Sequence, residues 1–203
     1  RVFVLSAYAG ITDMLLEHKK TQKPGVYSLF SGTDSEWAWS DSISEVGQKM
    51  REINARIFTD PADLAEADRF VRERIEGVRS CMIDLHRLCS YGHFKLDEHL
   101  MTVREMLSAL GEAHSAFNTT LLLQKHGINA QFVDLTGWRD MAHLPLDERI
   151  ELAFKSIDIS KTLPIVTGYA QCNEGLMSTY DRGYTEITFS RIAVLTKARE
   201  AII

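Results

Sequence analysis

The sequence lacks several features that would assign it to a familiar class of protein. No apolar run approaches the ~18 residues that a membrane-spanning helix needs. No basic stripe offers a nucleic-acid surface, and the net charge is −5. The three cysteines, Cys81, Cys89 and Cys172, form neither a CxxC pair nor a disulfide framework. We therefore expect no membrane and no nucleic acid as partners, structural thiols, and a reducing, cytoplasmic compartment.

The common catalytic motifs are also missing. No two of the 12 glycines lie closer than seven positions, so there is no GxGxxG fingerprint, and Walker A, HExxH and GxSxG are absent. The seven histidines lack metal-ligand spacing, so no metal site is expected. The opening RVFVLSAYAG imitates a signal peptide, but its single Arg and the lack of a Met favour a strand that runs into a turn.

Length and periodicity predict one or two globular domains of the α/β class. The chain has 203 residues, 45% hydrophobic and 25% charged. Predicted buried strands cover residues 2–7, 130–135 and 163–170, and residues 200–203 suggest the start of another. Predicted helices cover 12–20, 35–58, 61–91, 96–125, 145–157 and 187–196, with loops at 23–33 and from Gly175. This order favours a mainly parallel sheet covered by helices.

Local signals refine this prediction at three places. Asp60 is expected to cap the helix that starts at Pro61, and Thr12 to cap the first helix. Gly111 and Glu112 predict a break or a kink inside the fourth helix. Both ends of the chain are apolar, so we expect the sheet to be incomplete on both sides.

Three short segments lie where binding groups are common. Residues 6–12 follow the first strand, where parallel sheets bind ligands and helix amides favour anions. Glu112 could hold an ammonium group, and Arg182, in the loop 179–186, could clamp a carboxylate. Each segment also has an ordinary structural interpretation: a tight turn, a solvated glutamate at a kink, and a surface loop with a capping threonine. Together the segments suit a zwitterionic acid.

The chain at these segments resembles the aspartokinases of the amino-acid kinase superfamily. VLSAYAGITDMLLE is similar to their SA-x-x-G-x-T strand and turn, and LSALGEAHSAFNTTLLLQKHGINAQFVD to their SxGE helix followed by a strand. LPIVTGYAQCNEGLMSTYDRGYTEITFSRIA occupies the place of their GRGGSD-type loop. The resemblance implies a three-layer α/β/α sandwich, with residues 1–203 forming part of an amino-acid kinase domain.

The third motif departs from the usual pattern. Arg182 and Gly183 are kept, Tyr184 replaces a glycine, and Thr185 and Glu186 stand for Ser and Asp. The STYDRGYTE form is similar to the specialised aspartokinase associated with ectoine synthesis.

The resemblance also implies site residues and an activity. Ser6, Thr12, Glu112, Arg182 and Thr185 would line an aspartate pocket, in which Arg182 pairs with a carboxylate and Glu112 with the ammonium group. Glu186 would lie near the reacting phosphoryl group, and Ala7 and Gly10 near the nucleotide. The reaction implied is transfer of the γ-phosphoryl group of ATP, with Mg²⁺, to the β-carboxylate of L-aspartate.

Two family features are not found in these residues. The K-x-GG-T-S segment with its catalytic Lys would precede Arg1, and the nucleotide-binding and ACT regions would follow Ile203. We therefore expect these 203 residues alone to be inactive, and the full-length protein to be a homo-oligomer. Two alternatives stay open: a related acid kinase with another carboxylate substrate, and a non-catalytic binding or oligomerisation module that uses the apolar stripes of residues 35–125.

Overall fold

The computed structural model describes residues 1–32 and 37–203, which form two compact units. The first unit combines Arg1–Ser6 with Ser115–Ile203, and the second is Ala7–His114. Helix α5 (Leu100–Lys125) contributes its first part to the second unit and its last part to the first. The second unit is therefore an insertion into the sequence of the first.

The first unit is built on a three-stranded parallel sheet. Its strands are β1 (Phe3–Leu5), β2 (Ala130–Val133) and β3 (Leu163–Thr167), in the order β1-β3-β2. The central strand β3 is the most buried, as its unbroken apolar run predicts. The expectation that the first strand is buried is wrong, because β1 lies at an edge of the sheet and Phe3 is 42% exposed.

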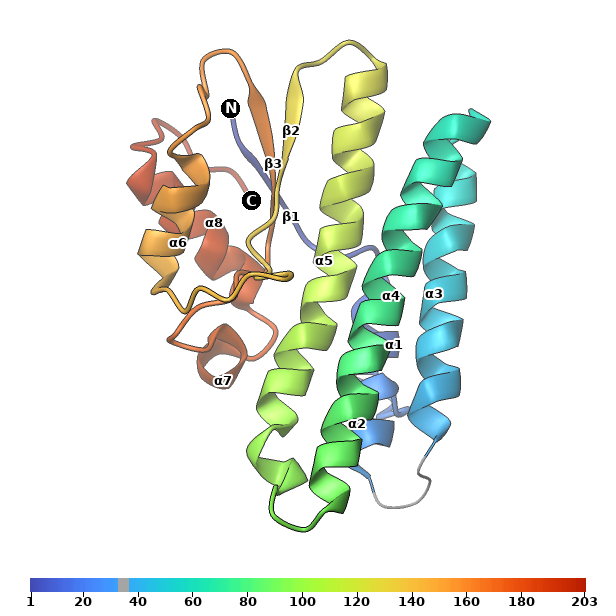
Figure 1. Ribbon diagram of the computed structural model, residues 1–203. Helices are drawn as coiled ribbons and strands as arrows, with labels where there is room; N and C mark the ends of the chain where they lie inside the picture. The colour runs from blue at the N-terminus through green and yellow to red at the C-terminus, as the bar shows by residue number, and fades with distance from the viewer. Residues whose placement is uncertain (33–36) are drawn as a thin grey trace. The chain divides into compact units, whose positions relative to one another are not determined.

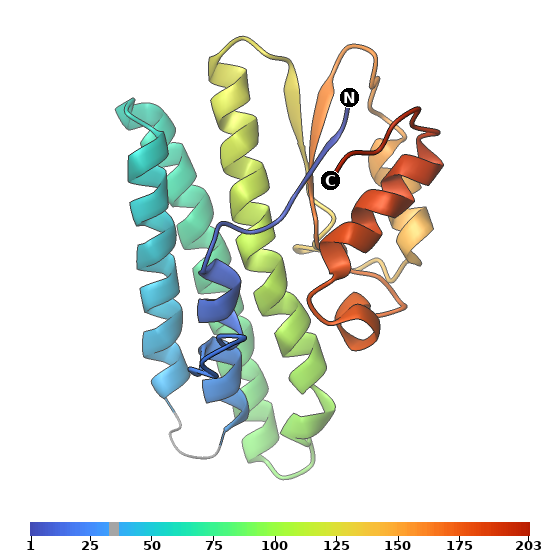
Figure 2. The ribbon, with the colours of Figure 1, turned by 180° about the vertical axis from the view of Figure 1, so that it is seen from behind.

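Helices cover both faces of this sheet (Figures 1 and 2). The last part of α5 lies on one face, where Ala116, Ala130 and Ile165 form a buried apolar cluster. Helices α6 (Leu146–Phe154) and α8 (Tyr184–Leu195) lie on the other, and α7 (Leu176–Tyr180) precedes α8. The parallel α/β architecture is confirmed, and its layers are compatible with an α/β/α sandwich.

The second unit is helical. It contains α1 (Ile11–Leu15), α2 (Val26–Ser31), α3 (Ala38–Ile57), α4 (Pro61–Ser90), the short 3-10 helix η1 (Leu96–Glu98) and the first part of α5. Helices α3 and α4 run side by side as a hairpin (Figure 1). The Asp60 carboxylate accepts hydrogen bonds from the amides of Ala62 (2.8 Å) and Asp63 (3.4 Å), which confirms the predicted cap. The predicted start of α3 at Ser35 lies outside the described residues.

The short elements differ from the predictions. The first helix ends at Leu15 because Glu17 pairs with Pro24 in an antiparallel bridge, and the N-cap of α1 is Gly10 rather than Thr12. Segments predicted as loops contain α2 and α7. Residues 200–203 form no strand. None of the helices in the described ranges is long and apolar enough to cross a membrane.

The break predicted at Gly111 is also wrong, because α5 runs without interruption from Leu100 to Lys125. A Cβ atom at Gly111 would lie 2.8 Å from Ala7 Cβ and 3.1 Å from Ile11 Cγ2. The glycine thus permits a close approach inside the second unit, at a helix position where it costs about 1 kcal/mol in propensity.

Candidate functional site

The carboxyl ends of the three strands meet at one edge of the sheet in the first unit, because the strands are parallel. Ser6 follows β1 there and is exposed. The amide of Gly168 donates to the carbonyl of Leu5 (2.9 Å), and the hydroxyl of Ser115 donates to the carbonyl of Ser6 (2.6 Å). The structure thus places Ser6 at the edge where the sequence predicts ligand binding.

Thr167 connects the ends of β2 and β3. Its hydroxyl accepts a hydrogen bond from the amide of Leu135 (3.0 Å) and donates one to the carbonyl of Tyr169 (2.9 Å). The side chain is fully buried, and the amide of Gln171 donates to the carbonyl of Leu135 (2.8 Å). The two strand-end loops are therefore held to each other by backbone and side-chain hydrogen bonds.

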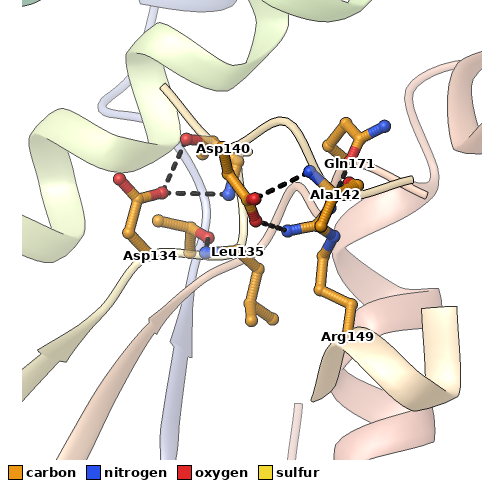
Figure 3. A network of polar contacts seen from close by, with 8 residues as sticks. Asp134, Leu135, Asp140, Ala142, Arg149 and Gln171 are labelled. Atoms are coloured by element: carbon orange, nitrogen blue, oxygen red, sulfur yellow. Dashed lines mark hydrogen bonds and ion pairs between the residues drawn. The ribbon is translucent and has the colours of Figure 1, made fainter. Parts of the chain in front are cut away.

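Arg149 of α6 organises the loop after β2 (Figure 3). Its guanidinium donates to Asp140 Oδ2 (2.9 Å), to the carbonyl of Ala142 (2.7 Å) and to Gln171 Oε1. The amide of Ala142 and the Arg149 guanidinium hold the pKa of Asp140 below its ordinary value. The sequence pattern predicts the helix that carries Arg149 but gives no sign of this role. The burial of Arg149, which is 5% exposed, is visible only in the structure.

The predicted Arg182 loop lies between α7 and α8. Arg182 is half-buried in this turn, Thr185 is half-buried in the first turn of α8, and Glu186 is exposed there. The N-cap of α8 is Gly183, without a side-chain cap, so the alternative of a capping threonine in this loop is wrong. The ring of Tyr184 packs edge-on against Tyr169, with centroids 5.5 Å apart, so the start of α8 is anchored to the end of β3.

The other predicted site residues belong to the second unit. Gly10 is exposed with φ +83, a conformation that favours glycine, and Thr12 is half-buried in α1. Helix α1 has only five residues, so the predicted anion-binding helix amides are few. Glu112 is 2% exposed, which contradicts the reading of a solvated glutamate. Its neighbour Gly111 packs close to Ala7, so Glu112 and the turn after Ser6 lie near each other in this unit.

Three hydrogen-bonded polar side chains that the sequence did not reveal lie in the second unit. Asn54 Nδ2 donates to Asp68 Oδ1 (2.8 Å), and Asn54 Oδ1 is 2.7 Å from His114 Nε2. The amide oxygen can only accept, so Nε2 carries the proton of the imidazole. Burial lowers the pKa of His114 to about 4, so the ring is neutral at physiological pH.

The three cysteine side chains form no disulfide with one another. Cys81, Cys89 and Cys172 are free, and burial raises the pKa of Cys172 to about 11. Within residues 1–32 and 37–203, no group of three or more His, Cys, Asp or Glu side chains could hold a metal ion.

Comparisons with known proteins point to one relative. No family model and no solved structure matches the chain. A curated protein, "Aspartate kinase Ask_Ect" of Stutzerimonas stutzeri (strain A1501), is 53% identical over all 203 residues. The chain spans 43% of the length of that relative. The resemblance to the aspartokinases, which three sequence motifs predicted, is therefore confirmed, as is the resemblance to the ectoine type, which the STYDRGYTE segment predicted.

Proposed function

We propose that the protein to which this chain belongs is an aspartate kinase. A β-carboxylate oxygen of L-aspartate attacks the γ-phosphorus of ATP, the bond from that phosphorus to the β,γ-bridging oxygen breaks, and 4-phospho-L-aspartate and ADP result. The observation that carries this proposal is the 53% identity over the whole chain to a curated aspartate kinase. The chain spans less than half of that relative, so the activity is proposed for the full-length protein.

Residues of the first unit are proposed to hold the acidic end of the substrate. The guanidinium of Arg182 can grip both oxygens of a carboxylate, with the hydroxyls of Ser6 and Thr185 as further donors. The anchoring of Tyr184 on Tyr169 supports this role, because it fixes the start of α8 beside Arg182. Glu186, exposed in the same helix turn, is proposed to act near the reacting phosphoryl group.

Residues of the second unit are proposed to recognise the ammonium group. Glu112 is almost fully buried, and a carboxylate in such a place attracts a cation more strongly than one in water. Thr12 is proposed as a neighbouring hydroxyl contact on α1. Because these assignments rest on separate units, each can be tested by its own variant.

ATP is proposed to contact the turn at Ala7 and Gly10. The turn leaves room for a ligand to approach its backbone, because Gly10 is exposed and a Cβ there would meet no atom within 4 Å. Mg²⁺ is implied by the kinase resemblance alone. The described residues include no metal-binding group of three, so we assign no protein ligands to the ion and derive no step through it.

The test is an ADP-release assay on the full-length protein with L-aspartate, L-glutamate and L-asparagine as separate substrates. We expect turnover with aspartate alone, together with trapping of the acyl phosphate by hydroxylamine. Asparagine is the matched control, since it lacks only the β-carboxylate. Turnover with another acid would favour the related acid kinase, and turnover with none would favour the binding or oligomerisation module.

A second measurement addresses assembly. Light scattering of the full-length protein should give the mass of a homo-oligomer.

A third measurement addresses the ammonium contact. Glu112→Gln should raise the KM for aspartate, since a charge-assisted hydrogen bond is worth roughly 1.5–3 kcal/mol. The matched control is Glu98→Gln in the exposed part of η1, which should leave the KM unchanged.

A further inference from the structure

Helix α5 contains hydroxyl groups with two kinds of partner. Ser108 and Thr120 donate to the carbonyls of Arg104 (2.9 Å) and Ala116 (2.8 Å), four residues earlier in the same helix. Ser115 donates to the carbonyl of Ser6 (2.6 Å), which is 109 positions away in the chain. Ser115 and Thr120 are equally buried, at 4% exposure, so they differ mainly in what their hydroxyls hold.

The bond to Ser6 fixes more than one atom. A peptide group is planar, so fixing the carbonyl oxygen of Ser6 also fixes the direction of the N–H that follows it. The second attachment of this strand end is the bond from the Gly168 amide to the carbonyl of Leu5 (2.9 Å). Two different elements therefore hold the consecutive carbonyls at the end of β1. The loop after β3 holds that of Leu5, and α5 holds that of Ser6.

We propose that Ser115 is a positioning residue, whose hydroxyl holds the Ser6 peptide so that Ser6 meets the substrate carboxylate in one orientation. This inference rests on the proposed function, because the role of Ser6 toward aspartate comes from it. Ser115 itself makes no proposed contact with the substrate. Its effect passes through the backbone of a residue at the exposed edge of the sheet.

The test compares Ser115→Ala with Thr120→Val in the full-length protein. Both changes delete one buried hydroxyl from α5, and Ser115→Thr restores the donor. We expect Ser115→Ala to raise the KM for aspartate by about threefold to tenfold, the value of one hydrogen bond, with kcat changed by less than about twofold. Thr120→Val should leave both constants unchanged, and Ser115→Thr should recover most of the loss.

Amide hydrogen exchange supplies a readout that does not depend on catalysis. Exchange of the backbone around Ser6 should speed up by about threefold to tenfold in Ser115→Ala and not in Thr120→Val. Unchanged exchange at Ser6, or equal acceleration and an equal fall in Tm for both variants, would overturn the inference. A wild-type protein with no aspartate-dependent turnover would overturn the proposed function, and the exchange comparison would still decide whether Ser115 holds Ser6.

Discussion

Replacing Gly111 by alanine sets two effects of opposite sign against each other. In a helix interior, alanine is more favourable than glycine by about 0.8–1.0 kcal/mol. The new Cβ, however, would lie 2.8 Å from Ala7 Cβ and 3.1 Å from Ile11 Cγ2. Carbon atoms pack best at about 3.5–4.0 Å, and Ala7 Cβ is fixed to its backbone, so relief requires one segment to move.

The magnitudes decide the sign. Overpacking costs about 1–3 kcal/mol, and this rigid contact belongs at the upper end, so Gly111→Ala should lower the free energy of unfolding by about 2 kcal/mol. The corresponding fall in Tm is about 4–8 °C. The matched control is Gly47→Ala in α3, where the nearest atom to the new Cβ is Ile75 Cγ1 at 3.4 Å. That variant should gain about 0.5–1 kcal/mol.

The assay is thermal unfolding of the full-length protein, followed by far-ultraviolet circular dichroism. If Gly111→Ala melts at or above the wild-type temperature, the close approach of α5 to Ala7 is refuted. If both variants lose stability equally, the contact with Ala7 does not explain the loss in Gly111→Ala, and the expected gain in Gly47→Ala is wrong.

Four further perturbations test other parts of the structure. Arg149→Lys keeps the charge but cannot serve all three acceptors, so urea unfolding should show a loss of about 2–4 kcal/mol; an unchanged midpoint would contradict the network. Asp60→Ala should cost about 1 kcal/mol and Asp60→Asn much less, a ranking that equal losses would disprove. His114 binds its proton more weakly in the folded state, so it contributes stability that is present above its unfolded pKa and is lost as pH falls; between pH 7 and pH 5 the loss is about 2 kcal/mol. His114→Gln should show a flatter pH dependence by this amount, and an equally steep one would argue against a buried neutral ring. Arg182→Ala should cost about 2–5 kcal/mol in kcat/KM for aspartate, and Arg182→Lys should still be harmful. Arg199, an exposed arginine after α8, is the control, and Arg199→Ala should leave kcat/KM unchanged. Normal kinetics in Arg182→Ala would remove Arg182 from the site.

Features with local causes were predictable from the sequence. The apolar stripe of α4, its Asp60 cap and its start at Pro61 all depend on residues within a few positions of one another. The apolar run of β3 likewise predicts a buried strand, which the structure shows. The position of Arg182 before a helix is also confirmed, although α8 begins at Tyr184 rather than at the predicted Ile187.

Features with distant causes were not predictable. Gly111 signals a helix break in isolation, and only its contact with Ala7 explains its presence in a continuous helix. The role of Arg149 depends on Gln171, 22 positions away, and that of His114 on Asn54, 60 positions away. A serine such as Ser115 has no local signal that separates a bond to a remote strand from a bond within its own helix.

The insertion of the helical unit between β1 and the rest of its sheet has a consequence for biosynthesis. Phe3 pairs with Ile165, so β1 leaves the ribosome long before its partner strand exists. The contacts of the α3–α4 hairpin are local in sequence, and such contacts form faster than distant strand pairing. We expect the helical unit to be protected first in pulsed hydrogen exchange during refolding, and β1 last. Until β3 is made, β1 lacks the parallel partner that it has in the folded sheet, and an apolar strand without its partner favours aggregation of the nascent chain.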